Sequence, residues 1–332
     1  MAEPVIPEDI WSLRPHEHYW IEKQPFLLSR GYLLRPRYHP GLVPPWKLYE
    51  PDAPLSATHR HGDAFPCLFE KIVDAIRVKD DVQVVLRRTW TGNQELSVLR
   101  SLSSDEARKS PDNRTVPLLD VISLPDDEEV LIVMPLLRQF HSPVFRDMGE
   151  ICEAIIQFIQ GLEFMHKRNI AHGDACFYNM MMDASEVIPD GWHFTAPRTD
   201  ASGDYEFHFK WRARALGFPV DYYFIDFGLS RFFPEGPKLA RAVGVFGQDR
   251  TVPELSATVP YNPFKVDIYQ LGNVFIRLTE KYPQARARFG PLFEDMTNPD
   301  PDARPTASRA FDNTCRKTRR TGVWMSSSMS WF

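Results

Sequence analysis

An aspartate and an asparagine five residues apart form the pattern in this chain that is most suggestive of chemistry. Asp174 and Asn179 lie in the segment 170–179 (IAHGDACFYN), which the surrounding pattern places on a loop between a helix and a short strand. There the Asp carboxylate can accept a hydroxyl proton while the Asn amide oxygen binds Mg²⁺, an arrangement suited to phosphoryl transfer. Asp and Asn are also common loop formers, so the pair alone leaves a purely structural role open.

A second segment, 224–228 (FIDFG), strengthens the case for a metal-dependent site. It reads as a strand that ends in Asp226 and is followed by Phe227 and Gly228. A carboxylate in this place can bridge a metal ion and nucleotide phosphates, and the glycine permits the turn that aims it. The two segments together predict phosphotransfer chemistry.

These segments need strands and helices to position them. The spacing of apolar residues predicts, in chain order, a hairpin (72–88), a short helix (95–102), two strands (115–122, 129–136), a long helix (148–167), two short strands (180–182, 222–225) and three helices (264–281, 289–297, 305–313). Strands that precede helices along the chain predict an α+β class with two lobes.

The first 66 residues differ in composition from the rest, since they hold 11 of the 29 prolines. Interior prolines break helices, so we expect an irregular extension without long helices over 1–66. Its Trp and Tyr residues favour packing on the body of the protein, because disordered linkers lack aromatic residues. A flexible tail with a few aromatic anchors is the alternative.

In their order along the chain, these motifs resemble those of the protein kinase superfamily. His172, Asp174 and Asn179, followed by Asp226, Phe227 and Gly228, resemble its catalytic loop and metal motif. Three later segments resemble its large lobe: 252–254 (VPE) the Ala-Pro-Glu motif, 267–272 (DIYQLG) the start of the central helix at Asp267, and 301–305 (PDARP) the Arg304 that pairs with Glu254.

The resemblance covers about residues 68–313 and implies a two-lobed fold, with a small antiparallel β lobe plus one helix and a large, mainly helical lobe. The implied boundaries are a small lobe at 67–137 with its hinge at 134–137, a large lobe at 138–313 with an insertion at 184–219, and a tail at 314–332. Segment 31–38 (GYLLRPRY) is also similar to the extension of kinase-like proteins of mushroom-forming fungi.

The same resemblance implies ATP and Mg²⁺ as cofactors, with Asn179 and Asp226 as the metal ligands and Asp174 as the base. The residues expected at the nucleotide are Val85, Arg87, Glu95, Met134, Pro135, Leu137 and Met181. Pro135 keeps a carbonyl and Leu137 keeps an N–H, so the hinge still permits adenine binding.

Several positions depart from the pattern of an active kinase. No Gly-x-Gly-x-x-Gly loop precedes the hairpin, and Arg87 stands where the family has a lysine. A planar guanidinium does not reproduce a compact ammonium at a phosphate site. Gly173, Cys176 and Gly247 stand where the family has an Arg, a Lys and a Thr. These losses weaken the stabilisation of charge in the transition state.

Three functions therefore remain open. The first is a weak, ATP/Mg²⁺-dependent protein Ser/Thr kinase acting on an unknown protein substrate. The second is a pseudokinase that serves as a binding or scaffold module. The third is a small-molecule phosphotransferase, because His-Gly-Asp with Asn five residues later also resembles the aminoglycoside and choline kinase-like group. The Glu254–Arg304 pair and Asp267 favour the protein-kinase reading over the third.

Composition narrows the possible partners. The net charge of −5 gives no electrostatic basis for binding nucleic acid or an anionic membrane. The longest uncharged apolar run, 130–137, is far shorter than the roughly 20 residues of a membrane span. Residues 1–4 (MAEP) do not begin a secretory signal, and the four cysteines form no CxxC pair. We expect an intracellular, cytoplasmic protein; the basic run 316–320 (RKTRR) is typical of a nuclear signal or, as we favour, a solvated face.

Overall fold

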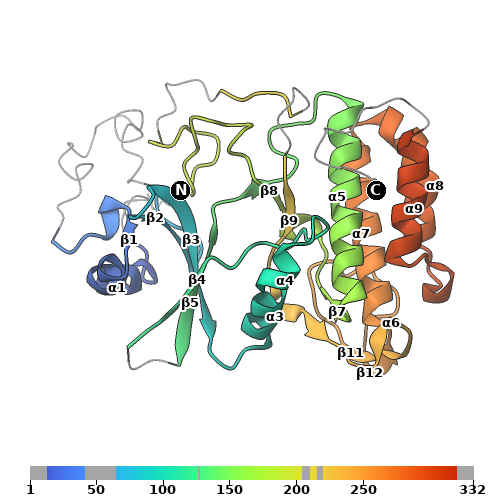
Figure 1. The fold of residues 1–332 in the computed structure, drawn as a ribbon, viewed down its shortest axis with the longest axis horizontal. Helices are drawn as coiled ribbons and strands as arrows, with labels where there is room; N and C mark the ends of the chain where they lie inside the picture. The colour runs from blue at the N-terminus through green and yellow to red at the C-terminus, as the bar shows by residue number, and fades with distance from the viewer. Residues whose placement is uncertain (1–12, 42–64, 126–127, 204–209, 215–219, 320–332) are drawn as a thin grey trace, which may run out of the picture. The chain divides into compact units, whose positions relative to one another are not determined.

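The computed structural model describes residues 13–41, 65–125, 128–203, 210–214 and 220–319 (Figure 1). The chain is a mixed protein of α-helices and antiparallel sheets, in agreement with the α+β class predicted from the sequence. Its contacts divide it into two compact units: unit 1 is Met1–Thr91, Leu119–Leu136 and Ile188–Arg212, and unit 2 is Gly92–Leu118, Leu137–Val187 and Ala213–Phe332. The lobe and hinge boundaries drawn from the sequence stay predictions.

Unit 1 is built on a five-stranded antiparallel sheet with the strand order β1-β2-β3-β5-β4. Its strands are β1 Tyr32–Leu34, β2 Ile72–Arg77, β3 Val82–Trp90, β4 Asp120–Ser123 and β5 Glu129–Pro135. The predicted hairpin is confirmed, because β2 and β3 pair from Ile72–Arg87 to Arg77–Val82. Asp81 closes its turn with a φ of 58°, a left-handed conformation that Asp tolerates.

The two faces of this sheet differ because side chains alternate along each strand. Val84 and Leu86 are fully buried and belong to the apolar core with Trp20 and Leu27 of helix α1 (Glu17–Ser29). Val85 and Arg87 are half-buried and lie on the opposite face of β3. Met134 is the direct partner of Val85 across β5, so it shares that face.

Helix α1 contradicts the expectation that residues 1–66 hold no long helix. It spans 13 residues with Pro25 inside it, and Trp20 and Leu27 are buried completely on its inner side. Packing of these side chains therefore outweighs the hydrogen bond that the proline removes. Strand β1 follows directly and pairs with β2, so part of the supposed irregular extension belongs to the sheet.

A fully buried ion pair fixes α1 to the chain that follows it. The Glu17 and Arg37 side chains are both 0% exposed, and Arg37 Nε lies 3.0 Å from Glu17 Oε1. Glu17 Oε1 also accepts hydrogen bonds from the Tyr38 hydroxyl (2.9 Å) and the Cys67 N–H (3.0 Å). One carboxylate thus holds the start of α1 to two separate stretches of chain.

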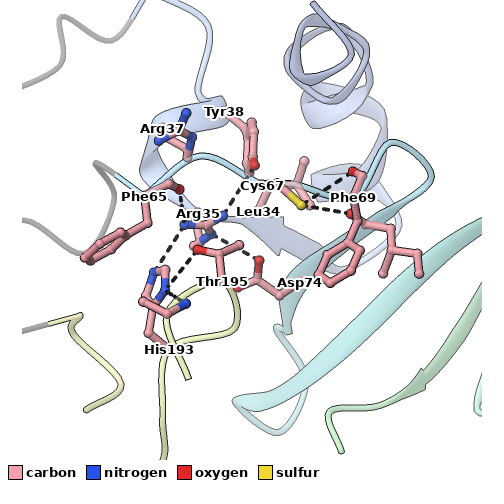
Figure 2. Close-up of polar contacts among 12 residues, drawn as sticks. Leu34, Arg35, Arg37, Tyr38, Phe65, Cys67, Phe69, Asp74, His193 and Thr195 are labelled. Carbon is pink, nitrogen blue, oxygen red and sulfur yellow. Dashed lines mark hydrogen bonds and ion pairs between the residues drawn. The ribbon is translucent and has the colours of Figure 1, made fainter. Parts of the chain in front are cut away.

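A second polar cluster joins residues 35, 65, 74 and 193 of unit 1, as Figure 2 shows. The Arg35 guanidinium donates to Asp74 on β2 (3.1 Å), to the Phe65 carbonyl (3.3 Å) and to the Tyr38 hydroxyl (3.3 Å), and lies 3.2 Å from His193 Nε2. His193 belongs to the predicted insertion at 184–219. The described part of this insertion therefore contacts the N-terminal region through Arg35.

Unit 2 contains the remaining helices and several short strands. The α-helices are α3 Gln94–Leu102, α4 Asp105–Arg108, α5 Met148–Lys167, α6 Gly236–Leu239, α7 Pro263–Thr279, α8 Pro283–Met296 and α9 Ala307–Arg319; the 3₁₀ helices are η4 Phe177–Asn179, η5 Phe227–Leu229 and η6 Pro301–Ala303. The strands are β6 Arg138–Gln139, β7 Ile170–Ala171, β8 Met180–Met182, β9 Tyr222–Phe224, β10 Arg231–Phe232, β11 Ala242–Gly244 and β12 Ser256–Tyr261.

The central element of unit 2 is α5, which packs against α7, α8, α9, β7 and β9 (Figure 1). Its bounds match the predicted helix, and the Asp147 carboxylate caps it by accepting from the Glu150 N–H at 3.0 Å. The predicted strands at 180–182 and 222–225 pair as β8 and β9. None of the described helices is long and apolar enough to cross a membrane.

Candidate functional site

The loop that carries Asp174 is anchored on α7 by Asp267. This carboxylate is fully buried, and its Oδ2 and Oδ1 accept hydrogen bonds from the backbone N–H groups of His172 and Gly173, each at 2.8 Å. His166 Nε2 of α5 lies 2.9 Å from Oδ2. Two consecutive peptide units of the loop are therefore fixed in direction by one side chain from a rigid helix.

The His172 side chain links this loop to the segment that carries Asp226. Its Nδ1 accepts from the Asp174 N–H at 3.2 Å, and its Nε2 lies 3.1 Å from the Ile225 carbonyl. An accepting Nδ1 requires the neutral tautomer with the proton on Nε2, which then donates to Ile225. His172 is fully buried and acts as a positioning residue in this network.

Asp174 is buried, with 6% of the residue exposed, and its carboxylate accepts three hydrogen bonds from Asn179 and Gln248. Its Oδ2 accepts from Asn179 Nδ2 at 3.0 Å and from Gln248 Nε2 at 3.4 Å, and its Oδ1 accepts from the Gln248 N–H at 2.8 Å. A carboxylate offers about four lone-pair sites, so Oδ1 keeps one for a hydroxyl donor.

The predicted metal ligands have a donor set that fits Mg²⁺. Asn179 directs its NH₂ group to the Asp174 carbonyl and carboxylate, so its amide oxygen is left for a cation. Its carbonyl accepts from the Ile225 N–H at 3.0 Å, which ties η4 to the residue before Asp226. The described residues contain no group of three His, Cys, Asp or Glu that could hold a metal, so phosphate and water oxygens would complete the shell, as is usual for Mg²⁺.

Asp226 adopts the left-handed conformation, with φ 62° and ψ 77°, at the start of η5. Its Oδ1 accepts from the Gly228 N–H at 3.4 Å. A non-glycine residue in this region costs free energy and is found disproportionately at functional sites. Phe227 is fully buried beside the His172 ring, at 5.1 Å between centroids, and Gly228 is exposed.

The predicted nucleotide residues belong to different parts of the chain. Val85, Arg87, Met134 and Pro135 lie on β3 and β5 in unit 1. The other three lie in unit 2: Leu137 before β6, Met181 in β8, and Glu95, which is 2% exposed, on α3. Helix α3 packs against η5 and β10, so Glu95 is carried by an element that contacts the segment after Asp226. Their roles toward a nucleotide stay predictions.

The three positions that depart from the family pattern have structural correlates. Gly173 has φ +79°, and a Cβ there would lie 2.6 Å from the Leu229 carbonyl oxygen, so the loop has no room for a side chain. Gly247 has φ +85° and would place a Cβ 3.0 Å from Asp174 Oδ1. Burial, together with the negative charge of Asp174, raises the pKa of the Cys176 thiol to about 12, so it stays protonated and unreactive.

The expected ion pair between Glu254 and Arg304 is formed. Arg304 NH1 and NH2 donate to Glu254 Oε1 and Oε2 at 2.6 and 2.8 Å, the parallel geometry in which guanidinium and carboxylate fit best. The guanidinium also donates through Nε to the Asn298 carbonyl at 2.7 Å. The Arg304 side chain is fully buried, so this pair fixes the loop before β12 to the segment between η6 and α9.

Two residues of the site were missed by sequence reasoning. Gln248 contributes two of the bonds to Asp174, and nothing in its sequence context marks it. Gln270 is fully buried, and its Oε1 accepts from the Ala175 N–H at 2.9 Å. It lies three residues after Asp267 on α7, a spacing that places both on one helix face and could have revealed it.

An open cavity of about 420 Å³ lies next to these residues in unit 2. It is lined by residues 176–178 of the loop that carries Asp174, by Gln248, Asp249 and Thr251, and by the α7 residues Gln270, Asn273, Val274, Ile276, Arg277 and Glu280. The chain matches no known protein-family model and no curated protein sequence. The chemistry of the site therefore has to be inferred from its own geometry.

Proposed function

We propose that this chain is a protein-kinase-like domain that transfers the γ-phosphate of Mg·ATP to Ser or Thr hydroxyls of a protein, at a low rate. The observation that carries the proposal is the anchored loop: Asp267 fixes the His172 and Gly173 N–H groups, and Asn179 donates to Asp174. A carboxylate that can act as a base and an amide oxygen that can bind a metal thus lie close together on one anchored loop, which supports the proposal. Positioning of this kind supplies most of the catalysis in phosphoryl transfer.

Each retained side chain has a role that suits this reaction. Asp174 accepts the proton of the attacking hydroxyl, while Asn179 and Asp226 hold the metal ion that neutralises charge on the phosphates. The buried Glu254–Arg304 pair supports the same assignment, because the resemblance to protein kinases predicts it at these two positions. The antiparallel sheet of unit 1 and the helices of unit 2 agree with the architecture that the resemblance implies.

The low rate follows from the groups that are absent around the phosphates. Cys176 is protonated and neutral where the family has a lysine, and Gly247 has no hydroxyl to offer to Asp174. Removing one stabilising donor costs about 10²–10³ in rate in other enzymes. Two or three such losses leave a slow enzyme even if the base and metal ligands are in place.

A pseudokinase that binds a protein partner is the second candidate, and two observations favour it. Gln248 donates hydrogen bonds to Asp174 from both its backbone N–H and its side-chain amide. A substrate hydroxyl would therefore have to share the Asp174 carboxylate with Gln248. The stretch that contains Gln248 also exposes six large apolar side chains: Phe232, Leu239, Val243, Val245, Phe246 and Val259. Apolar exposure on this scale is typical of interaction surfaces. The small-molecule phosphotransferase remains a third reading, which the Glu254–Arg304 pair disfavours.

The test is transfer of radiolabelled γ-phosphate from Mg·ATP to a generic basic protein, with choline and an aminoglycoside as small-molecule acceptors in parallel. Asp174→Asn is the blank, and Asp190→Asn, an exposed aspartate in unit 1, is the matched control. Slow labelling of protein that Asp174→Asn abolishes and Asp190→Asn retains supports the kinase. Labelling that survives Asp174→Asn refutes the assignment of the loop, and labelling of the small molecules alone supports the third reading.

If wild type labels nothing, binding of ATP separates the pseudokinase from an unrelated protein. Retained metal ligands predict that ATP with Mg²⁺ raises the melting temperature more than ATP with EDTA. A protein that responds to neither is not a nucleotide-binding domain of this kind.

A further inference from the structure

The orientation of the Gln270 amide is fixed by its neighbour. Its Oε1 accepts from the Ala175 N–H at 2.9 Å, a contact that an NH₂ group could not make because both partners would be donors. The Nε2 atom therefore points the other way. It is fully buried and has no hydrogen-bond partner among the residues that the structure describes. A buried donor without a partner is unfavourable, so the position of Nε2 requires an explanation.

The direction in which Nε2 points is given by Gly247. A Cβ built on Gly247 would lie 3.3 Å from Gln270 Nε2 and 3.0 Å from Asp174 Oδ1. Both atoms therefore lie within 3.3 Å of the same point, which limits the gap between them. One oxygen atom with a hydrogen bond of about 2.7–3.2 Å on each side can span that gap. The side of the base that Gly247 leaves uncovered thus has an acceptor, Oδ1, and a donor, Nε2, facing one small space.

The cavity of about 420 Å³ lies beside this place, since Gln270 and Gln248 both line it. Its outer wall is formed by exposed side chains, among them Gln248, Thr251, Arg277 and Glu280. Because these side chains are exposed, a segment of another chain can contact them. Tyr178, which is 50% exposed, supplies an aromatic surface in the same wall.

We propose that Gln270 binds the acceptor hydroxyl of a Ser- or Thr-containing peptide, with Nε2 donating to the hydroxyl oxygen while the hydroxyl donates to Asp174 Oδ1. This inference rests on the proposed function and names the acceptor site within it. In the transfer step, the hydroxyl oxygen bonds to the γ-phosphorus of ATP, and its proton passes to Asp174. The bond from that phosphorus to the bridging oxygen breaks, and the electron pair leaves with ADP. Gln270 thereby orients the oxygen lone pair that attacks.

The test measures hydroxyl recognition separately from catalysis. The probes are two fluorescent degenerate peptide pools that are identical except for a central Ser in one and Ala in the other. Their affinities for protein loaded with Mg·ADP are measured by anisotropy at pH 8, and the ratio isolates the contact to the hydroxyl. One hydrogen bond predicts a roughly three- to ten-fold preference for the Ser pool in wild type.

Three variants decide the outcome. Gln270→Met removes the whole amide, and Gln270→Glu keeps an oxygen for the Ala175 N–H while removing the donor. Gln157→Met is the matched control, because Gln157 is a buried glutamine on α5 whose Oε1 accepts from the Tyr222 N–H at 3.0 Å and whose Nε2 donates to the Val220 carbonyl at 2.8 Å. The Ser preference should vanish in both Gln270 variants and persist in Gln157→Met. If Gln270→Met does not fold, Gln270→Glu gives the answer alone.

The possible results separate this inference from the proposed function. A Ser preference that survives both Gln270 variants, or a wild type without any preference, overturns the acceptor site even if phosphate transfer is observed. A preference that depends on Gln270 in a protein that transfers no phosphate supports the site and counts against the kinase activity. Where transfer is measurable, the Gln270 variants should also raise the KM for the Ser pool about three- to ten-fold.

Discussion

Replacement of Arg304 by alanine is expected to destabilise unit 2 strongly, because it breaks a buried ion pair. The lost guanidinium makes two bonds to Glu254 and one each to the carbonyls of Asn298 and Lys265, at 2.6 to 2.9 Å. Removing one member of a buried pair costs about 3–5 kcal/mol, since the other charge is left without compensation. The Glu254 side chain is 14% exposed, so water relieves part of that cost and about 3 kcal/mol is expected.

A loss of this size lowers the melting temperature by about 6–12 °C for a unit of this length. Reversible thermal unfolding and urea titration followed by tryptophan fluorescence both measure it. Arg286→Ala is the matched control, because Arg286 lies 3.9 Å from Glu294 and the two side chains are 39% and 68% exposed, so less than about 1 kcal/mol is expected. An Arg304→Ala protein that melts within 2 °C of the Arg286→Ala protein would show that the pair does not hold the unit together, and both motif assignments would fail.

Three further predictions concern the nucleotide and the pH dependence of stability. ATP with Mg²⁺ at a hundredfold its dissociation constant should stabilise the protein by about 2.7 kcal/mol. Asp226→Asn should remove the difference in melting temperature between ATP with Mg²⁺ and ATP with EDTA. Equal melting-temperature shifts under these two conditions in wild type would mean that the metal site is vestigial. Arg87→Lys should raise phosphate transfer if the chain is an enzyme, because a compact ammonium fits the phosphates better, and no change in rate would favour the pseudokinase. Burial raises the pKa of Glu153 on α5 to about 7, so the folded protein holds a proton that the unfolded chain releases, and the free energy of unfolding should fall by roughly 2–3 kcal/mol as the pH rises from 4.5 to 7. Glu153→Gln should flatten that fall in urea titrations across this range, and parallel curves for the two proteins would contradict it.

The parts of the fold that could be predicted are those in which local pattern and packing agree. Helix α5 has the bounds predicted for it, because Ile151, Ile155 and Ile159 repeat at helical spacing and face the core. The strand predicted at 115–122 begins only at Asp120. Pro117 interrupts the stretch before it, and Thr115 forms a single bridge to Phe224 in place of a ladder.

The parts that could not be predicted depend on contacts between residues far apart in the chain. Helix α1 was missed because its proline content argues against a helix, whereas the buried Trp20 and the Glu17–Arg37 pair stabilise it through tertiary contacts. Within the candidate site, Asp174 and Asn179 were found by their spacing. Gln248 could not be found in this way, because its bonds to Asp174 exist only when a loop 74 residues later folds back.

The close approach of Gly173 to Leu229 has a consequence for the substitutions that this position can accept in evolution. The backbone occupies the space that a side chain at Gly173 would need, with φ +79° and only 2.6 Å between a built Cβ and the Leu229 carbonyl oxygen. A single substitution to a larger residue at this position would strain the loop that holds Asp174, and it would be selected against. A side chain at residue 173 therefore has to be preceded by a change in the segment around Leu229, so the order in which mutations occur decides whether this position can change.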